Sequence, residues 1–265
     1  MVGSNKSNLK AKKSLGQNFL IDEVIINKIV NEVFSCKDDL IIEIGPGKGA
    51  LTKKLKEKGC FVIAYEIDLD LKPYLDKLID EKTTIIYQDI LKSDLKKDLE
   101  NKKYHHLNIV GNLPYYITTP IIEKIIEQEL DFEKLVIMVQ KEVADRFMAS
   151  AGSKEYGYIT LLLKHYFDVS KVCDVANTAF NPKPKVQSSV IVFKPRKDKI
   201  ELDILKYKNF LKKCFQFKRK TLKNNLINYD WKIIKKVLND HNLNEQVRAE
   251  ELEEKVLLDI FYQLY

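Results

Sequence analysis

Short apolar runs alternate with amphipathic helical patterns over the first half of the chain. The runs are rich in β-branched residues, as expected for strands covered on both faces, and they occur at Leu40–Ile44, Phe61–Tyr65, Thr84–Tyr87, Leu107–Val110 and Leu135–Val139. Between them, apolar residues recur at helical spacing opposite Lys and Glu, as in Ile121, Ile122, Ile125 and Ile126. This alternation predicts an α/β fold with a mostly parallel, doubly wound sheet.

The pattern changes after Lys141. Two further strands are predicted at Tyr166–Val175 and Ser188–Lys194, and they are expected to close the sheet as an antiparallel pair. A linker at 194–198 leads to three predicted helices, Ile204–Phe215, Trp231–Asn239 and Glu250–Leu264. We therefore expect a large α/β domain over residues 1–195 and a small α-helical domain over residues 200–265.

Composition narrows the class of protein. The 265 residues are 45% hydrophobic, but no apolar run approaches the roughly 20 residues that cross a bilayer. The polar, lysine-rich segment Met1–Lys13 lacks the apolar region of a secretory signal. The four cysteines are far apart, and His105 and His106 are expected to be solvated edge residues. These features predict a cytoplasmic protein with neither a metal site nor disulfides.

The net charge of +7 is unevenly placed along the chain. No Asp or Glu occurs from Ile204 to Tyr229, whereas eight Lys or Arg residues do, including Lys218, Arg219, Lys220 and Lys223. Phenylalanines are interleaved among them. This stretch fits either a surface that binds a polyanion or a solvated helix face with core aromatics.

Polar residues follow each of four successive predicted strands. Glu43 stands at the end of the first strand, before Gly45 and Gly47, and Glu66 and Asp89 follow the second and third. Ligands bind at this edge of open α/β sheets, where an acid can hold ribose hydroxyls. The Gly-x-Gly-x-Gly spacing departs from the dinucleotide fingerprint, so the set favours S-adenosylmethionine. Taken singly, Glu43 also fits a strand end, Glu66 a helix start and Asp89 an N-cap.

The fourth strand ends in Asn112-Leu113-Pro114-Tyr115. The Asn112 side-chain oxygen and the Pro114 carbonyl can accept the two hydrogens of an exocyclic amine, and the Tyr115 ring can stack on a base. The alternative interpretation is a rigid turn with a partly buried tyrosine, because short motifs carry false positives.

These residues belong to an ordered series of motifs. The series comprises Leu15-Gly16-Gln17-Asn18-Phe19-Leu20, Glu43-Ile44-Gly45-Pro46-Gly47, Glu66, Asp89, Asn112–Pro120, Val139–Arg146, Gly152–Gly157, Phe180–Ser188 and Phe217–Leu226. From about residue 12 to 230, the chain resembles the ribosomal RNA adenine N6,N6-dimethyltransferases of the bacterial KsgA type. The resemblance implies a Rossmann-like class I methyltransferase sheet and S-adenosylmethionine as cofactor.

The resemblance also implies roles for individual residues. Those expected around the cofactor are Gln17, Asn18, Leu20, Glu43, Gly45, Gly47, Glu66, Ile67, Asp89, Ile90 and Asn112. Asn112 and Pro114 would orient the target amine, and Tyr115 and Phe180 would sandwich the flipped base. Because Phe180 precedes a loop with two prolines, we expect it to face outward rather than into the core. Lys218, Arg219, Lys220 and Lys223 would contact RNA phosphates.

The implied reaction is dimethylation of two adjacent adenosines in a hairpin loop near the 3′ end of small-subunit rRNA. The implied partner is the 30S particle, with the enzyme acting as a monomer. Three alternatives remain: an Erm-type enzyme acting on large-subunit rRNA, a non-catalytic ribosome-assembly factor that binds RNA, and a nicotinamide-dependent oxidoreductase. The Tyr116–Pro120 and Phe217–Leu226 segments speak against the first, and the intact Asn112–Tyr115 motif against the second. The glycine spacing speaks against the third.

Overall fold

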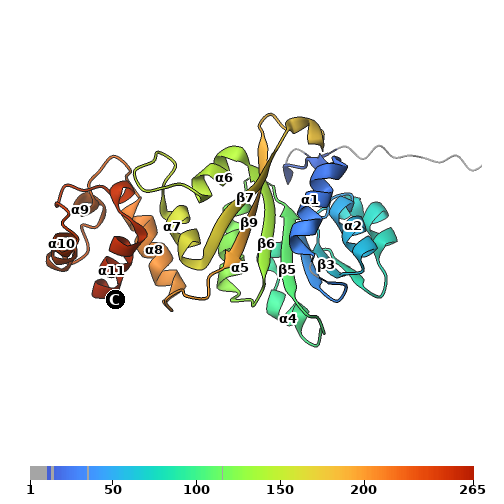
Figure 1. Ribbon diagram of the computed structural model, residues 1–265, viewed down its shortest axis with the longest axis horizontal. Coiled ribbons are helices and arrows are strands. Elements are labelled where there is room, and N and C mark those ends of the chain that lie inside the picture. The colour runs from blue at the N-terminus through green and yellow to red at the C-terminus, as the bar shows by residue number, and fades with distance from the viewer. Residues whose placement is uncertain (1–10, 13–14, 35, 115) are drawn as a thin grey trace, which may run out of the picture. The chain divides into compact units, whose positions relative to one another are not determined.

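The computed structural model of the chain describes residues 11–12, 15–34, 36–114 and 116–265. Over these residues the dominant feature is a seven-stranded sheet with the strand order β4-β3-β2-β5-β6-β9-β7. Its order can be followed in Figure 1 from β3 through β5, β6 and β9 to β7. The strands are β2 (Leu40–Ile44), β3 (Phe61–Tyr65), β4 (Thr83–Ile86), β5 (Leu107–Asn112), β6 (Lys134–Gln140), β7 (Phe167–Val175) and β9 (Ser188–Pro195).

Strand directions confirm the predicted sheet. The pairs β2–β3, β3–β4, β2–β5 and β5–β6 are all parallel, and β9 joins β6 antiparallel. All five residues of β2 are buried, which explains why its sequence is a continuous apolar run rather than an alternating one. The parallel strands therefore bring their carboxyl ends to one edge of the sheet.

Helices cover the sheet on both faces, as the doubly wound prediction requires. The connecting helices are α1 (Glu23–Val33), α2 (Ala50–Lys58), α3 (Lys72–Leu75), α4 (Leu95–Leu99) and α5 (Thr118–Glu127), with 3-10 turns η2 (Leu69–Leu71), η3 (Asp76–Leu78) and η4 (Ile90–Lys92). Asp22 caps α1 by accepting hydrogen bonds from the N–H groups of Val24 and Ile25. The apolar face of α1 then packs in one core cluster with Ile41 and Val110 of the sheet.

A second, two-stranded sheet lies outside the main one. Strand β1 (Phe19–Leu20) pairs antiparallel with β8 (Phe180–Asn181), which follows the 3-10 turn η5 (Asn177–Ala179). The register places Leu20 opposite Phe180. The pairing thus connects the Gln17–Leu20 motif with the proline-containing segment predicted to face outward.

The chain forms two compact units whose boundaries differ from the predicted domains. The first unit comprises the chain up to Lys141 together with Lys171–Phe193, and the second comprises Glu142–Ser170 together with Lys194–Tyr265. The predicted boundary near residue 195 therefore lies close to Lys194, where the chain passes from the first unit to the second for the last time. Residues 142–170, however, group with the C-terminal helices. The separate catalytic and RNA-binding roles of the two domains stay predictions.

The second unit is largely helical. It contains most of α6 (Lys141–Phe147), together with α7 (Tyr158–Tyr166), α8 (Ile204–Cys214), α9 (Leu222–Asn225), α10 (Trp231–Asp240), η6 (Ala249–Glu251) and α11 (Glu254–Leu264). The helices predicted in the last third are confirmed, although α11 begins only at Glu254, after the separate turn η6. Buried rings join α8 to α11, with the ring centroids of Tyr207 and Phe261 5.1 Å apart. Within the described part of the chain, no helix combines the length and apolar character needed to cross a membrane.

Candidate active site

One pocket gathers the predicted strand-end residues at the carboxyl edge of the parallel sheet. Its lining comes from the segment before β1 and from the loops that follow β2, β3, β4 and β5. All the residues predicted to contact the cofactor are among those that line it: Gln17, Asn18, Leu20, Glu43, Gly45, Gly47, Glu66, Ile67, Asp89, Ile90 and Asn112. Leu15, Tyr65, Gln88 and Tyr116 also line the pocket, although the sequence analysis assigned them no contact with the cofactor.

The glycine-rich loop after β2 makes the pocket floor accessible to a ligand. Gly47 adopts a φ of +59°, in the left-handed region that glycine tolerates best. A Cβ atom placed on it would lie 3.1 Å from the Phe19 ring, tighter than ordinary packing. A side chain at position 47 would therefore both strain the backbone and displace Phe19 from the wall of the pocket.

Glu66 lies where a ribose could be held. Its carboxylate is buried and accepts hydrogen bonds from the backbone N–H groups of Asp68, at 2.8 Å, and Gly47, at 3.2 Å. Burial raises the pKa of Glu66, and these two N–H groups counter part of that rise. Each carboxylate oxygen keeps a second lone pair, so the group can still accept hydrogens from a diol.

Glu43 is turned toward helix α2. The Thr52 hydroxyl donates to its carboxylate at 2.6 Å, and the side chain is fully buried. Burial is the main reason that the pKa of Glu43 rises to about 7, while the Thr52 hydrogen bond lowers it. Glu43 thus stabilises the glycine-loop scaffold, and its predicted direct contact with the cofactor stays a prediction.

Asp89 caps the 3-10 turn η4 while it lines the pocket. Its carboxylate accepts a hydrogen bond from the Leu91 N–H at 3.0 Å. The N-cap interpretation is confirmed, and it is compatible with the predicted contact to the cofactor, because an N-cap carboxylate uses one lone pair and leaves others for a ligand amine. Acceptors at Glu66 and Asp89, with the open backbone at Gly47, fit the ribose and adenine groups of S-adenosylmethionine.

Asn112 is fixed by the segment before β1. Its Nδ2 donates to the Asn18 carbonyl oxygen at 2.9 Å. Because this bond uses the amide nitrogen, the acceptor Oδ1 is the atom left to receive a hydrogen from a substrate amine. The contact also shows how residues 94 positions apart in sequence meet at one end of the pocket.

The Pro114 carbonyl is already engaged. It accepts hydrogen bonds from the Ile117 N–H, at 3.1 Å, and from the Thr118 hydroxyl, at 3.3 Å, at the start of α5. A substrate amine would reach this oxygen only in competition with Thr118. The sequence could not anticipate this, because the competition arises from the turn that begins the helix. Tyr115 lies outside the described residues.

Phe180 does not face outward as predicted. Its side chain is 1% exposed and packs in the same core cluster as Leu20, its partner across the β1–β8 pair. It is not among the residues that line the pocket. The expectation of an outward-facing ring is therefore wrong, because β-pairing with Leu20 outweighs the turn tendency of the following prolines. Its predicted role in stacking stays untested.

A clasp that the sequence did not reveal holds the segment before β1 to the loop after β3. It is formed by Lys12, Gln17, Asp68 and Asp70. Lys12 Nζ lies 2.5 Å from Asp68 Oδ1 and 2.6 Å from Asp70 Oδ2, and Gln17 Nε2 donates to Asp68 Oδ2 at 2.6 Å. Burial alone would raise the pKa of Asp68, but the hydrogen bonds from Lys12 and Gln17 hold it below its usual range. The alternating acids Glu66, Asp68 and Asp70 were the available signal.

The predicted RNA-contacting residues lie in the second unit, on the turn between α8 and α9 and at the start of α9. Lys218, Arg219, Lys220 and Lys223 are all exposed. Lys218 Nζ donates to the Lys154 carbonyl oxygen at 2.6 Å, and Lys223 lies over the Trp231 ring. The interleaved phenylalanines differ in exposure. Phe210 is buried, whereas Phe217 is 54% exposed beside the basic residues. A cationic turn with one exposed ring is thus available to a polyanion.

Comparisons with known proteins agree on one family. A family profile described as "Ribosomal RNA adenine dimethylase" matches residues 8–264. A relative from Mycoplasma mobile, "Ribosomal RNA small subunit methyltransferase A", is 44% identical over 96% of this chain and 98% of its own length. The protein of the same name from Mycoplasmopsis pulmonis is 42% identical over 97% of this chain and 100% of its own. A dimethyladenosine transferase from Plasmodium falciparum is structurally similar, with a TM-score of 0.76 and 26% identity over 91% of this chain and 95% of that one.

Proposed function

The chain belongs to the ribosomal RNA adenine dimethylase family, and from that membership we propose that it methylates N6 of two adjacent adenosines in a hairpin loop near the 3′ end of small-subunit rRNA. It is an rRNA adenine dimethyltransferase that uses S-adenosylmethionine as methyl donor. We propose further that its substrate is the 30S particle during ribosome biogenesis, that it acts in the cytoplasm where such particles are assembled, and that it acts as a monomer.

The observation that supports this function best is the convergence of four strand ends on one pocket. Glu43, Glu66, Asp89 and Asn112 each stand at or just after the carboxyl end of a different strand, and all of them line that pocket. A glycine-floored cleft with acceptors for a diol and an amine suits an adenosyl group. Asn112 then stands at the end of the pocket where a second amine, that of the target base, would enter.

Bound S-adenosylmethionine would supply an electrophilic methyl group. The exocyclic amine of adenine is a weak nucleophile because its lone pair is delocalised into the ring. Asn112 Oδ1 would accept an amine hydrogen and favour a pyramidal nitrogen, an interaction that strengthens as the nitrogen gains positive charge. Alignment of the reactants supplies much of the rest, since well-oriented reactants gain roughly 7–11 kcal/mol. Of the two predicted acceptors, Asn112 is the stronger candidate, because Thr118 and Ile117 occupy the Pro114 carbonyl.

The target base must leave its stack before it reaches Asn112. Bases in RNA loops are splayed out at modest cost, and stacking on an aromatic ring returns about 1–3 kcal/mol per base. We assign that stacking to Tyr115, with Phe180 as a second ring if β8 separates from β1 on RNA binding. The exposed cations Lys218, Arg219, Lys220 and Lys223 would hold phosphates, with Phe217 beside them.

The function is tested by incubating the full-length protein with labelled S-adenosylmethionine and unmethylated ribosomal particles. We expect label in N6,N6-dimethyladenosine from 30S particles and none from 50S particles. Label confined to 50S particles would instead identify a large-subunit enzyme, and RNA binding without label from either particle would identify a non-catalytic assembly factor. Free small-subunit rRNA, run in parallel, shows whether the assembled particle is needed.

A further inference from the structure

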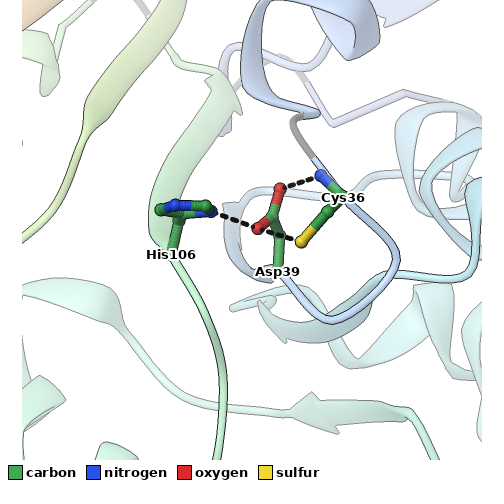
Figure 2. A group of neighbouring side chains, drawn as sticks. All are labelled: Cys36, Asp39 and His106. Carbon is green, nitrogen blue, oxygen red and sulfur yellow. Dashed lines mark hydrogen bonds and ion pairs between the residues drawn. The ribbon is translucent and has the colours of Figure 1, made fainter.

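Cys36, Asp39 and His106 bring three metal-binding atoms together at the end of the sheet opposite the pocket (Figure 2). The ligand atoms of these side chains all lie within 4.8 Å of one another. Cys36 and Asp39 precede β2, and His106 precedes β5. The group is thus about one strand length, roughly 15–20 Å, from the carboxyl ends that form the pocket.

The parallel register explains why residues so far apart in sequence meet. Leu40 of β2 lies opposite Leu107 of β5, so the residues just before them, Asp39 and His106, are neighbours. A backbone hydrogen bond from the Leu40 N–H to the His106 carbonyl at 2.9 Å fixes this pairing. A tight turn then brings in Cys36, whose N–H donates to Asp39 Oδ2 at 2.8 Å.

The separations suit a tetrahedral cation. Asp39 Oδ1 lies 2.8 Å from His106 Nδ1 and 3.1 Å from Cys36 Sγ. Ligands around Zn²⁺ stand roughly 3.4–3.6 Å apart, given bonds of about 2.0–2.3 Å at tetrahedral angles. A small outward movement of each side chain would therefore open the space for an ion. His105 Nδ1 lies 3.4 Å from Cys36 Sγ but does not belong to this group, so three side chains supply the ligand atoms.

The order of contacts among Cys36, Asp39 and His106 differs from that in a catalytic site with a cysteine nucleophile. In such a site an imidazole stands between the thiol and the carboxylate, whereas here Asp39 contacts both Cys36 and His106 (Figure 2). Asp39 is fully buried, while the His106 side chain is 42% exposed and leaves a route for an ion. Thiolate, imidazole and carboxylate together are the donor set that zinc prefers.

We propose that Cys36, Asp39 and His106 bind one Zn²⁺ ion, with water as its fourth ligand. The ion replaces the thiol proton of Cys36, which is released on binding. Its ligands come from the turns before β2 and β5, so the ion ties together the amino-terminal ends of two neighbouring strands. Because the group lies at the opposite end of these strands from the pocket, the ion has a structural role and takes no part in methyl transfer.

The test uses the full-length protein, stripped with a chelator and titrated with Zn²⁺ or Co²⁺ alone. Wild type is expected to bind about one equivalent, and Co²⁺ should produce a thiolate-to-metal charge-transfer absorption. Cys36→Ser and His106→Gln should each weaken binding by at least about tenfold and abolish or alter that absorption. The matched controls Cys173→Ser and His241→Gln, which change residues outside the cluster, should bind as wild type does.

Two further measurements keep the test decisive if a variant folds poorly. Zn²⁺ should protect Cys36 of the wild-type protein from alkylation while leaving Cys173 unaffected, and it should raise the Tm of wild type but not of Cys36→Ser. Zinc affinity equal in wild type and Cys36→Ser would overturn the proposal. So would a Tm of wild type that Zn²⁺ leaves unchanged, and the group would then be a network centred on the Asp39 carboxylate.

Discussion

At the scale of single residues, the proposed site places a few acceptors and supplies no nucleophile. Asn112 is held through its nitrogen by the Asn18 carbonyl, so its oxygen is the atom that we propose for the substrate amine. Glu66 and Asp89 are held by backbone N–H groups in the same way. Such groups are fixed before substrate arrives, so little reorganisation is needed during reaction.

Replacing Asn112 by alanine is expected to reduce single-turnover methyl transfer by about 10²–10³-fold, the usual cost of losing one fixed polar partner of the transition state. Cofactor affinity, measured by calorimetry, should change far less, because the groups assigned to the adenosyl moiety remain. The control is Asn239→Ala, an exposed position on α10. Turnover in Asn112→Ala close to that of wild type would contradict the assigned role.

Glu43 predicts a specific pH dependence of stability. Its pKa is raised from 4.5 to about 7, chiefly by burial, so the folded state keeps a proton that the unfolded chain has already lost. The stability that this carboxyl contributes is fully present below about pH 4.5 and declines until about pH 7, by up to about 3 kcal/mol in total.

We therefore expect the free energy of unfolding of wild type, relative to Glu43→Gln, to fall between about pH 5 and pH 7 and then level off. Glutamine can still accept the Thr52 hydrogen bond but has no proton to lose. Urea denaturation of both proteins across this range measures the difference. Parallel pH profiles for the two proteins would show that Glu43 titrates normally.

At the scale of elements, the β1–β8 pair decides what Phe180 does. The ring is buried against the core beside Leu20, so it supports the strand that carries the Gln17–Leu20 motif. This position makes a structural role and a base-stacking role experimentally separable. If Phe180 serves only packing, a variant that keeps the stability should keep the turnover, whereas a stacking role predicts that the turnover is lost.

Phe180→Ala should lower the free energy of unfolding by about 3–5 kcal/mol, the usual cost of deleting a buried phenylalanine. Phe180→Leu should restore most of that stability and, if the ring serves only packing, most of the activity as well. Denaturation and methyl-transfer rates are measured on both variants. A Phe180→Leu protein that is stable but inactive would restore the stacking role to Phe180.

Sequence pattern predicted the parallel sheet because each strand is a short β-branched run, and it predicted the pocket because polar residues follow those runs. It missed α6 and α7, although Ile159 and Leu161–Leu163 offered an apolar signal. It also missed contacts between residues far apart in sequence. These are Asp39 beside His106, the hydrogen bond between Gln17 and Asp68, and Phe180 opposite Leu20. Local chemistry is readable from sequence, whereas partners supplied by distant strands are not.

At the scale of the whole molecule, the modest net charge includes a local excess of positive charge, which we propose binds RNA. The chain carries +7 overall, but the turn after α8 concentrates Lys218, Arg219 and Lys220 beside an exposed Phe217. Phosphate contacts of this kind dominate affinity and make it depend on salt. The turn belongs to the second unit, whereas the residues proposed to hold the cofactor belong to the first.

Changing Lys218, Arg219 and Lys220 together to glutamine should weaken RNA binding. It should also reduce the steepness with which the logarithm of the association constant falls with the logarithm of salt concentration. The slope should fall by up to about 2–3, given roughly 0.7–0.9 per phosphate contact. The matched control changes Lys97, Lys102 and Lys103, which are exposed around and after α4 and remove the same charge. Equal slopes for the two triple variants would mean that the basic turn is only a solvated surface.

The Lys12–Gln17–Asp68 clasp has a consequence for cofactor binding. Gln17 lines the pocket and donates to Asp68 at 2.6 Å, and the same carboxylate pairs with Lys12. A change at position 12, which does not itself line the pocket, should therefore alter cofactor affinity by releasing the Gln17 amide from its fixed position.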